Sequence, residues 1–228
     1  MGFDQKKKEL LARAGFGPRL LASVQQAQQQ GYMKPYIHLD TELPGIVSLF
    51  SFDPQVAKPM SELAEVLLRR PSTLTIGERE LIASFVSKMN GCEFCYGSHA
   101  ACTRHFMDPE TVDAFLEDED SEAVDMHMRT LLVVAYHVKS LNRESLAEAI
   151  NFAKLAGATD QEIHDTVAIA AAFCMFNRYV DGLGTTFEPE DLETSGASIA
   201  KYGYKMNWGR LIHEIIPQMW KRIFGSKS

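Results

Sequence analysis

Two cysteines three positions apart, with a histidine and a carboxylate at fixed distances from them, are the residues of this sequence best suited to chemistry. They are Cys92 and Cys95, with His99 four residues after the second thiol and Glu80 twelve residues before the first. Two thiols one helical turn apart can close a disulfide, and a helix N-terminus can stabilise one of them as a thiolate. The pattern therefore indicates reversible thiol oxidation, with proton-handling groups at hand.

A helix over residues 76–89 is predicted to carry Glu80. Thr75 as N-cap and Glu78 three residues later make a capping box, which marks the start of this helix. Glu80 lies beside the apolar stripe of the helix, on a face of small side chains that also contains two serines. We expect this face to let the following helix approach closely and bring Glu80 toward the thiols.

A second helix, over about 92–106, is predicted to carry the thiols. The helix-breaking Asn-Gly dipeptide at 90–91 places the first cysteine in the opening turn of this helix. Cys95, His99 and Cys102 then follow at intervals of four and three residues, along one stripe. His99 is therefore expected to reach Cys95, whereas Cys102 is interpreted as a small buried apolar residue.

The combined pattern Glu-x11-Cys-x2-Cys-x3-His resembles the alkylhydroperoxidase D-like branch of the carboxymuconolactone decarboxylase superfamily. The segments 74–82 and 176–184 are similar to the peroxidase-related subgroup of that branch, and the resemblance covers roughly residues 40–190. It implies an all-α helical bundle with the Cys-x-x-Cys motif at a helix N-terminus. It also implies a homotrimer or homohexamer that reduces hydroperoxides or disulfides through the dithiol.

The same resemblance assigns a role to each of the four residues. Cys95 would be the attacking thiol, Cys92 the resolving thiol, and Glu80 with His99 the proton relay. The substrate would be a hydroperoxide and the reductant an unidentified thiol or dithiol protein, with no bound cofactor or metal ion. One position departs from the pattern, because Phe94 stands where some members have a histidine. The proton transfer assigned to that histidine is missing here, and the charge of Glu93 within the motif opposes thiolate formation, so a weak or specialised reductase is expected.

The residues leave other interpretations open. Two cysteines and a histidine lack only a fourth ligand to make a zinc site, although the sequence has no second Cys-x-x-Cys and no His-x3-His. Other superfamily members decarboxylate a lactone with acid-base groups and no dithiol. A non-catalytic module that binds metal or senses oxidants is a third interpretation. The dithiol favours the peroxidase, with a role in antioxidant defence.

The composition is that of a soluble globular protein. A length of 228 residues is enough for one domain with a substantial core, and 46% hydrophobic with 23% charged residues excludes a disordered or collagen-like chain. The net charge of −7 argues against a general nucleic-acid binder. No stretch reaches the ~18 apolar residues of a membrane span. The first residues lack the pattern of a secretory signal, so a cytoplasmic location is expected.

Helical periodicity runs through almost the whole sequence and predicts an all-α fold. Arg178 follows a wholly apolar run that contains Cys174, a residue expected in the core. Arg178 is predicted to pair with Asp181 as a structural or interface element, with an alternative in which it faces the active site. Beyond the two site helices, capping and breaking residues predict further helices at 54–70, 109–116, 121–140, 143–156 and 159–181.

The chain divides into three predicted segments. An N-terminal arm occupies 1–39, the alkylhydroperoxidase D-like domain 40–190, and a C-terminal helical extension 191–228. The extension contains an amphipathic pattern over about 206–224 in a basic context. Apolar helix faces usually fill cores or interfaces, so this helix is predicted to pack against a subunit rather than lie on a membrane.

Overall fold

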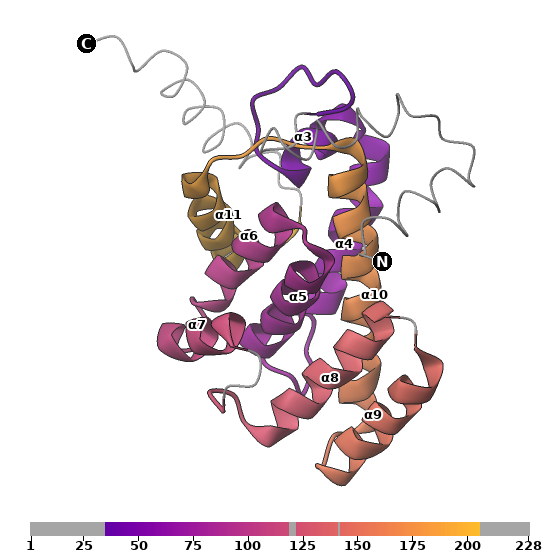
Figure 1. Ribbon diagram of the computed structural model, residues 1–228. Helices are drawn as coiled ribbons and strands as arrows, with labels where there is room; N and C mark the ends of the chain where they lie inside the picture. The colour runs from indigo at the N-terminus through magenta and orange to yellow at the C-terminus, as the bar shows by residue number, and fades with distance from the viewer. Residues whose placement is uncertain (1–34, 119–121, 141, 206–228) are drawn as a thin grey trace, which may run out of the picture.

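The structure is a computed structural model that describes residues 35–118, 122–140 and 142–205. Within these ranges it contains nine α-helices and no β-strand, which confirms the all-α prediction. The helices, labelled as in Figure 1, are α3 (Ile46–Phe52), α4 (Pro54–Arg69), α5 (Ile76–Asn90), α6 (Glu93–Thr103), α7 (Pro109–Glu117), α8 (Met126–Ser140), α9 (Arg143–Leu155), α10 (Asp160–Leu183) and α11 (Pro189–Tyr202).

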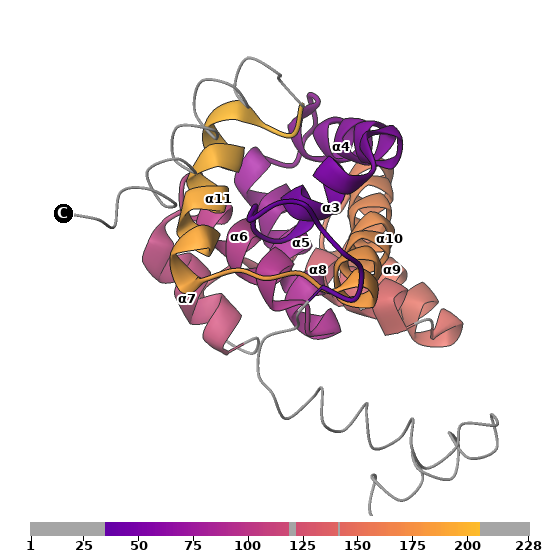
Figure 2. The same ribbon diagram turned by 90° about the horizontal axis from the view of Figure 1, so that it is seen from above.

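Helix α5 lies at the centre of the bundle. It packs against α6 on one side and against the long helix α10 on the other, and α11 covers the outer side of α6 (Figures 1 and 2). Helices α4 and α8 also contact α5, and α9 packs on α8. The hairpin of α5 and α6, which carries the predicted site, is therefore enclosed by helices that come from both ends of the described chain.

Capping groups begin the main helices where the sequence predicts. The side chain of Asp53 accepts hydrogen bonds from two backbone amides at the start of α4, where a proline occupies the first turn. Thr75 with Glu78, and Thr159 with Glu162, form complete capping boxes at α5 and α10. Each box satisfies amide groups that have no partner within the helix, so these two predicted starts are confirmed.

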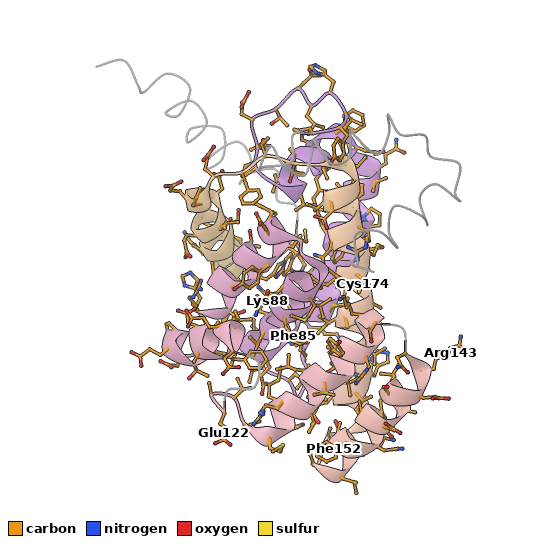
Figure 3. The ribbon with its side chains drawn as sticks, in the orientation of Figure 1. Phe85, Lys88, Glu122, Arg143, Phe152 and Cys174 are labelled. Carbon is orange, nitrogen blue, oxygen red and sulfur yellow. The ribbon has the colours of Figure 1, made fainter. Side chains whose placement is uncertain are left out.

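The core forms where the apolar faces of α5, α8 and α10 meet. Figure 3 shows Phe85 of α5 in the interior, where its ring centroid lies 5.9 Å from that of Phe115 on α7. No helix of the described part of the chain is long and apolar enough to cross a membrane. The largest fully buried side chains include Leu81, Ile82, Val86, Leu131, Ile169 and Phe173.

Two predicted helix boundaries differ from the structure. Helix α8 begins at Met126 rather than 121, because the Asp125 carboxylate caps it by accepting the Met128 amide at 2.8 Å. Helix α6 ends at Thr103 rather than near 106. The amides of His105 and Phe106 bond to the carbonyls three positions back, as in a tightening last turn, before Asp108 starts α7.

Helices α3 and α11 were not predicted from the sequence. A signal for α11 was present, since Pro189 occupies its first turn and Asp191 accepts the Glu188 amide at 2.8 Å. Helix α11 packs so closely against α6 that a Cβ at Gly196 would lie only 2.4 Å from the Cβ of Ala101. The predicted boundary at 190 therefore separates α11 from the helix on which it packs.

Other predicted segments lie outside the described residues. These are most of the N-terminal arm and the amphipathic helix at 206–224.

Candidate active site at the hairpin of α5 and α6

The turn between α5 and α6 places both cysteines at a helix start. Gly91 ends α5 in the left-handed conformation with φ 73°, which glycine adopts without steric cost. The Cys92 amide then bonds to the Ser87 carbonyl at 3.1 Å, and Cys92 is the N-cap of α6. Cys95 follows in the first turn of α6, where free amide groups and the helix dipole favour a negative charge.

Small side chains allow α5 and α6 to pack closely. Ser84 and Ser87 are fully buried, and the Ser84 hydroxyl donates to the Tyr96 carbonyl of α6 at 3.2 Å. The Ser87 hydroxyl accepts a hydrogen bond from the Asn177 amide of α10 at 3.0 Å. The same face of α5 carries Glu80, so this close packing brings its carboxylate against α6.

Glu80 is fully buried and accepts three hydrogen bonds from three separate segments. Its Oε1 accepts from Arg69 Nη1 of α4 at 2.6 Å and from the Tyr204 hydroxyl, after α11, at 2.7 Å. Its Oε2 lies 2.6 Å from Nδ1 of His99 on α6. Glu80 and His99, predicted to act together, are therefore in direct contact.

These donors determine the charge of Glu80. Burial alone would raise the pKa of its carboxyl, but His99, Arg69 and the Tyr204 hydroxyl together hold the pKa below its usual range. An ionised carboxylate only accepts hydrogen bonds, so Nδ1 of His99 carries the hydrogen in this contact. The arrangement leaves Nε2 as the histidine nitrogen that can take a proton.

The dithiol belongs to a cluster of buried apolar side chains beside this network. Cys92 and Cys95 are both buried, and they pack with Phe94 of α6 and Val180 of α10. Phe94 also contacts Phe187, with 5.5 Å between the ring centroids. Partly buried apolar side chains from α3, the segment after α10, and α11 complete the surroundings, namely Ile46, Phe187 and Leu192.

The two thiols differ in their neighbours. A hydrogen bond with Cys95 raises the pKa of Cys92, and burial and the Asp181 carboxyl raise it further. Burial in turn raises the pKa of Asp181. Cys92 therefore holds its proton strongly, while Cys95 is the thiol in the first turn of α6.

No hydrogen bond joins Glu80 or His99 to either thiol of the dithiol among the described residues. His99 lies one turn after Cys95 on α6, and its ring packs edge-on against Phe173 at 4.6 Å between centroids. A proton passing between the dithiol and His99 would therefore travel through a bridging water or a bound substrate.

Three residues of this region were not assigned to the site from the sequence. Arg69, Asp181 and Tyr204 come from α4, α10 and the segment after α11. Asp181 was assigned only to Arg178, whose largely exposed guanidinium lies 3.8 Å away and also donates to Asn90. The spacing of Arg69, Asp181 and Tyr204 to the cysteines follows no sequence motif, so only the three-dimensional packing reveals these residues.

The other two cysteines have separate surroundings. Cys102 is fully buried, and its sulfur lies 3.6 Å from Arg69 Nη2; burial raises the pKa of its thiol. Cys174, labelled in Figure 3, is partly buried on α10, 3.6 Å from the Asn90 amide. Within the described ranges, no cluster of three or more histidine, cysteine or acidic side chains is arranged to hold a metal ion.

Comparison with solved structures identifies the fold. No protein-family model matches the chain, and no curated protein matches its sequence. An uncharacterised peroxidase-related protein from Ralstonia eutropha JMP134, described as an alkylhydroperoxidase AhpD core, matches with a TM-score of 0.60 and 24% identity. The match covers 65% of this chain and 79% of that one. A peroxidase-related protein from Silicibacter sp. TM1040 gives 0.60 and 23% over 65% and 78%.

A third structure covers nearly all of the related chain. It is a protein of unknown function from Agrobacterium tumefaciens, with the suggested name antioxidant defence protein AhpD, and it matches with a TM-score of 0.55 and 21% identity. The match covers 66% of this chain and 95% of that one. The described part of this chain therefore has the alkylhydroperoxidase D-like fold that the sequence motif predicted.

Proposed function

We propose that this protein is a thiol-dependent peroxidase that reduces hydroperoxides through the Cys92–Cys95 dithiol. The observation that carries the proposal is a buried acid-base couple beside this dithiol. His99 lies one turn after Cys95 on α6, and Glu80 contacts His99 from α5. A dithiol alone would also suit a structural or metal-binding role. The adjacent acid-base couple is what peroxide chemistry needs in addition.

The first step activates and oxidises Cys95. His99 takes the thiol proton at Nε2 through a water molecule, while Glu80 keeps the ring oriented and stabilises the imidazolium, as a buried carboxylate does beside a catalytic histidine. The Cys95 thiolate attacks the terminal peroxide oxygen. An S–O bond forms, the O–O bond breaks, and the departing alkoxide takes the proton back from His99, giving an alcohol and a Cys95 sulfenic acid.

The second step closes the disulfide. The Cys92 sulfur attacks the Cys95 sulfenic sulfur, the S–O bond breaks, and hydroxide leaves with the Cys92 proton as water. A thiol or dithiol protein then reduces the disulfide by exchange. Phe94, in place of a histidine, supplies no second proton donor within the motif, so we expect slow peroxide turnover.

A homo-oligomer is part of this proposal. Large apolar side chains are exposed on α8, α9 and α10, among them Phe152 of α9, which Figure 3 labels, and exposed apolar patches often mark association surfaces. Light scattering should give a mass above that of one chain, and Phe152→Glu should lower it; a monomeric wild type would contradict this part. The exposed large apolar side chains of these three helices are Met126, Val133, Tyr136, Phe152, Leu155 and Met175.

The test is a thiol count before and after one equivalent of an organic hydroperoxide. Wild type should lose two thiols, and a dimedone adduct should form on Cys95 in Cys92→Ser but not on the other cysteine in Cys95→Ser. Cys174→Ser is the matched control and should behave as wild type. No thiol loss in wild type would refute the peroxidase.

The same preparations address the other interpretations. A carboxymuconolactone decarboxylase-like lyase should turn over lactone without either thiol. A metal-binding module should purify with one equivalent of zinc.

A further inference from the structure

Tyr204 lies outside the region 40–190 that carries the sequence resemblance, yet it contacts three members of the buried network. Its hydroxyl is 2.7 Å from Glu80 Oε1 and 3.3 Å from His99 Nδ1. Its ring lies nearly parallel to the imidazole, with 6.0 Å between centroids and 11° between planes. The Arg69 guanidinium carbon lies 5.0 Å from the centre of the same ring.

The segment that carries Tyr204 is held in place by α4. Glu65 of α4 accepts the Tyr204 amide at 2.8 Å with Oε2, and its Oε1 lies 3.7 Å from Lys205 Nζ. Gly203 turns the chain toward α4 with φ 70°, and a Cβ there would lie 2.6 Å from the Glu65 carboxylate. Arg69 adds a second attachment by donating to the Ile199 carbonyl of α11 at 3.2 Å.

We propose that Tyr204 is a positioning residue of the relay, whose hydroxyl acts with Arg69 to keep Glu80 ionised and directed at His99. Two donors occupy Oε1 of the carboxylate, so Oε2 is the oxygen that faces the histidine. Hydrogen bonds to a carboxylate stabilise its charged form. The inference rests on the proposed function, since it concerns the relay of the same dithiol.

The test is Tyr204→Phe, which keeps the ring and removes the hydroxyl. The Tyr204 hydrogen bond is one of the groups that lower the pKa of Glu80, so its loss should raise that pKa. The relay needs ionised Glu80, which exists above that pKa. The acid limb of the pH profile should therefore move upward by about one pH unit, which is a tenfold lower rate on that limb, with little change at alkaline pH.

Two rates should be followed against pH. The first is oxidation of the dithiol by cumene hydroperoxide, and the second is alkylation of Cys95 by iodoacetamide, with the modified residue identified by mass spectrometry. Tyr36→Phe, the same change at an exposed tyrosine outside both the site and the proposed association surface, is the matched control and should keep the wild-type profile. A wild-type profile in folded Tyr204→Phe would overturn the inference.

A second variant tests the attachment to α4. Glu65→Gln should shift the acid limb in the same direction as Tyr204→Phe, because the Tyr204 amide and Lys205 lose a charged partner. No shift would contradict a positioning role for the segment.

The alkylation measurement distinguishes a failure of this inference from a failure of the proposed peroxidase. If hydroperoxide oxidises no thiol in wild type, the peroxidase fails, while the alkylation profiles still decide whether Tyr204 acts on the relay.

Discussion

The two thiols occupy different surroundings although only two residues separate them. Cys95 lies in the first turn of α6, at the positive end of the helix dipole. Cys92 lies beside the partly buried carboxyl of Asp181, whose Oδ1 has no hydrogen-bond partner within the described protein. A negative charge on Cys92 would meet both the Cys95 sulfur and this carboxyl, which suits the order of attack proposed for the two thiols.

Replacing Asp181 should make Cys92 more acidic. In Asp181→Asn the carboxyl that helps raise the pKa of Cys92 is gone, so that pKa should fall. The measurement is the pH dependence of Cys92 alkylation in a Cys95→Ser background, which removes the larger influence of the second thiol. Asp113→Asn, at a half-exposed aspartate paired with Arg104, is the matched control. An unchanged or higher pKa for Cys92 would show that the Asp181 carboxyl does not act on this thiol.

Residues that share a local motif could be found from the sequence, whereas those brought together by packing could not. Glu80 and His99 lie on adjacent helices of one hairpin, so their spacing follows from helix geometry and a short turn. Arg69 and Tyr204 approach Glu80 from positions 11 and 124 residues away. Their places depend on how α4 and α11 pack, which no periodicity in the sequence specifies.

At the scale of elements, α11 packs on the helix that carries the thiols and ends two residues before Tyr204. It lies along the outer side of α6 in both ribbon views (Figures 1 and 2), and its Gly196 meets Ala101 of α6, next to Cys102. Capping signals predicted α4, α5 and α10 because those boundaries are local. The packing of α11 depends on Gly196 meeting α6, which is a long-range match.

Gly196→Ala should weaken the contact between α11 and α6. The added Cβ would lie 2.7 Å from the Cys102 amide nitrogen, and backbone atoms cannot move aside as a flexible side chain can. Overpacking of this kind typically costs about 1–3 kcal/mol. We expect denaturant unfolding to show that loss, together with a Tyr204→Phe-like shift in the pH profile.

Gly182→Ala is the control for that change. A Cβ at Gly182, in the last turn of α10, meets no atom within 4 Å, so this variant should be neutral or slightly more stable than wild type. Equal stability of Gly196→Ala and Gly182→Ala would show that α11 and α6 separate at little cost. The position of Tyr204 beside Glu80 would then need an explanation other than the packing of α11 on α6.

At the scale of the whole molecule, buried titratable groups on several helices link stability to pH. The pKa values of Glu80, Glu162 and Asp165 lie below their usual range, each despite burial, because hydrogen bonds or charges stabilise the ionised form. Burial raises the pKa of Cys102, and also that of Tyr204, where Glu80 adds to the effect. The first set opposes acid unfolding, and the second set opposes ionisation at high pH.

The melting temperature of the reduced protein should therefore be highest between about pH 5 and pH 8 and fall on both sides. A carboxyl with a lowered pKa stabilises the fold above its unfolded value, near 4.5 for glutamate, and this contribution is lost as the pH falls through the folded value. A thiol with a raised pKa stabilises the fold below its unfolded value, near 9.0, and this contribution is lost at higher pH. Glu80→Gln should flatten the acid side, and Cys102→Ala should flatten the alkaline side. A melting temperature that stays constant from pH 4 to pH 10 in wild type would mean that these buried groups do not control stability.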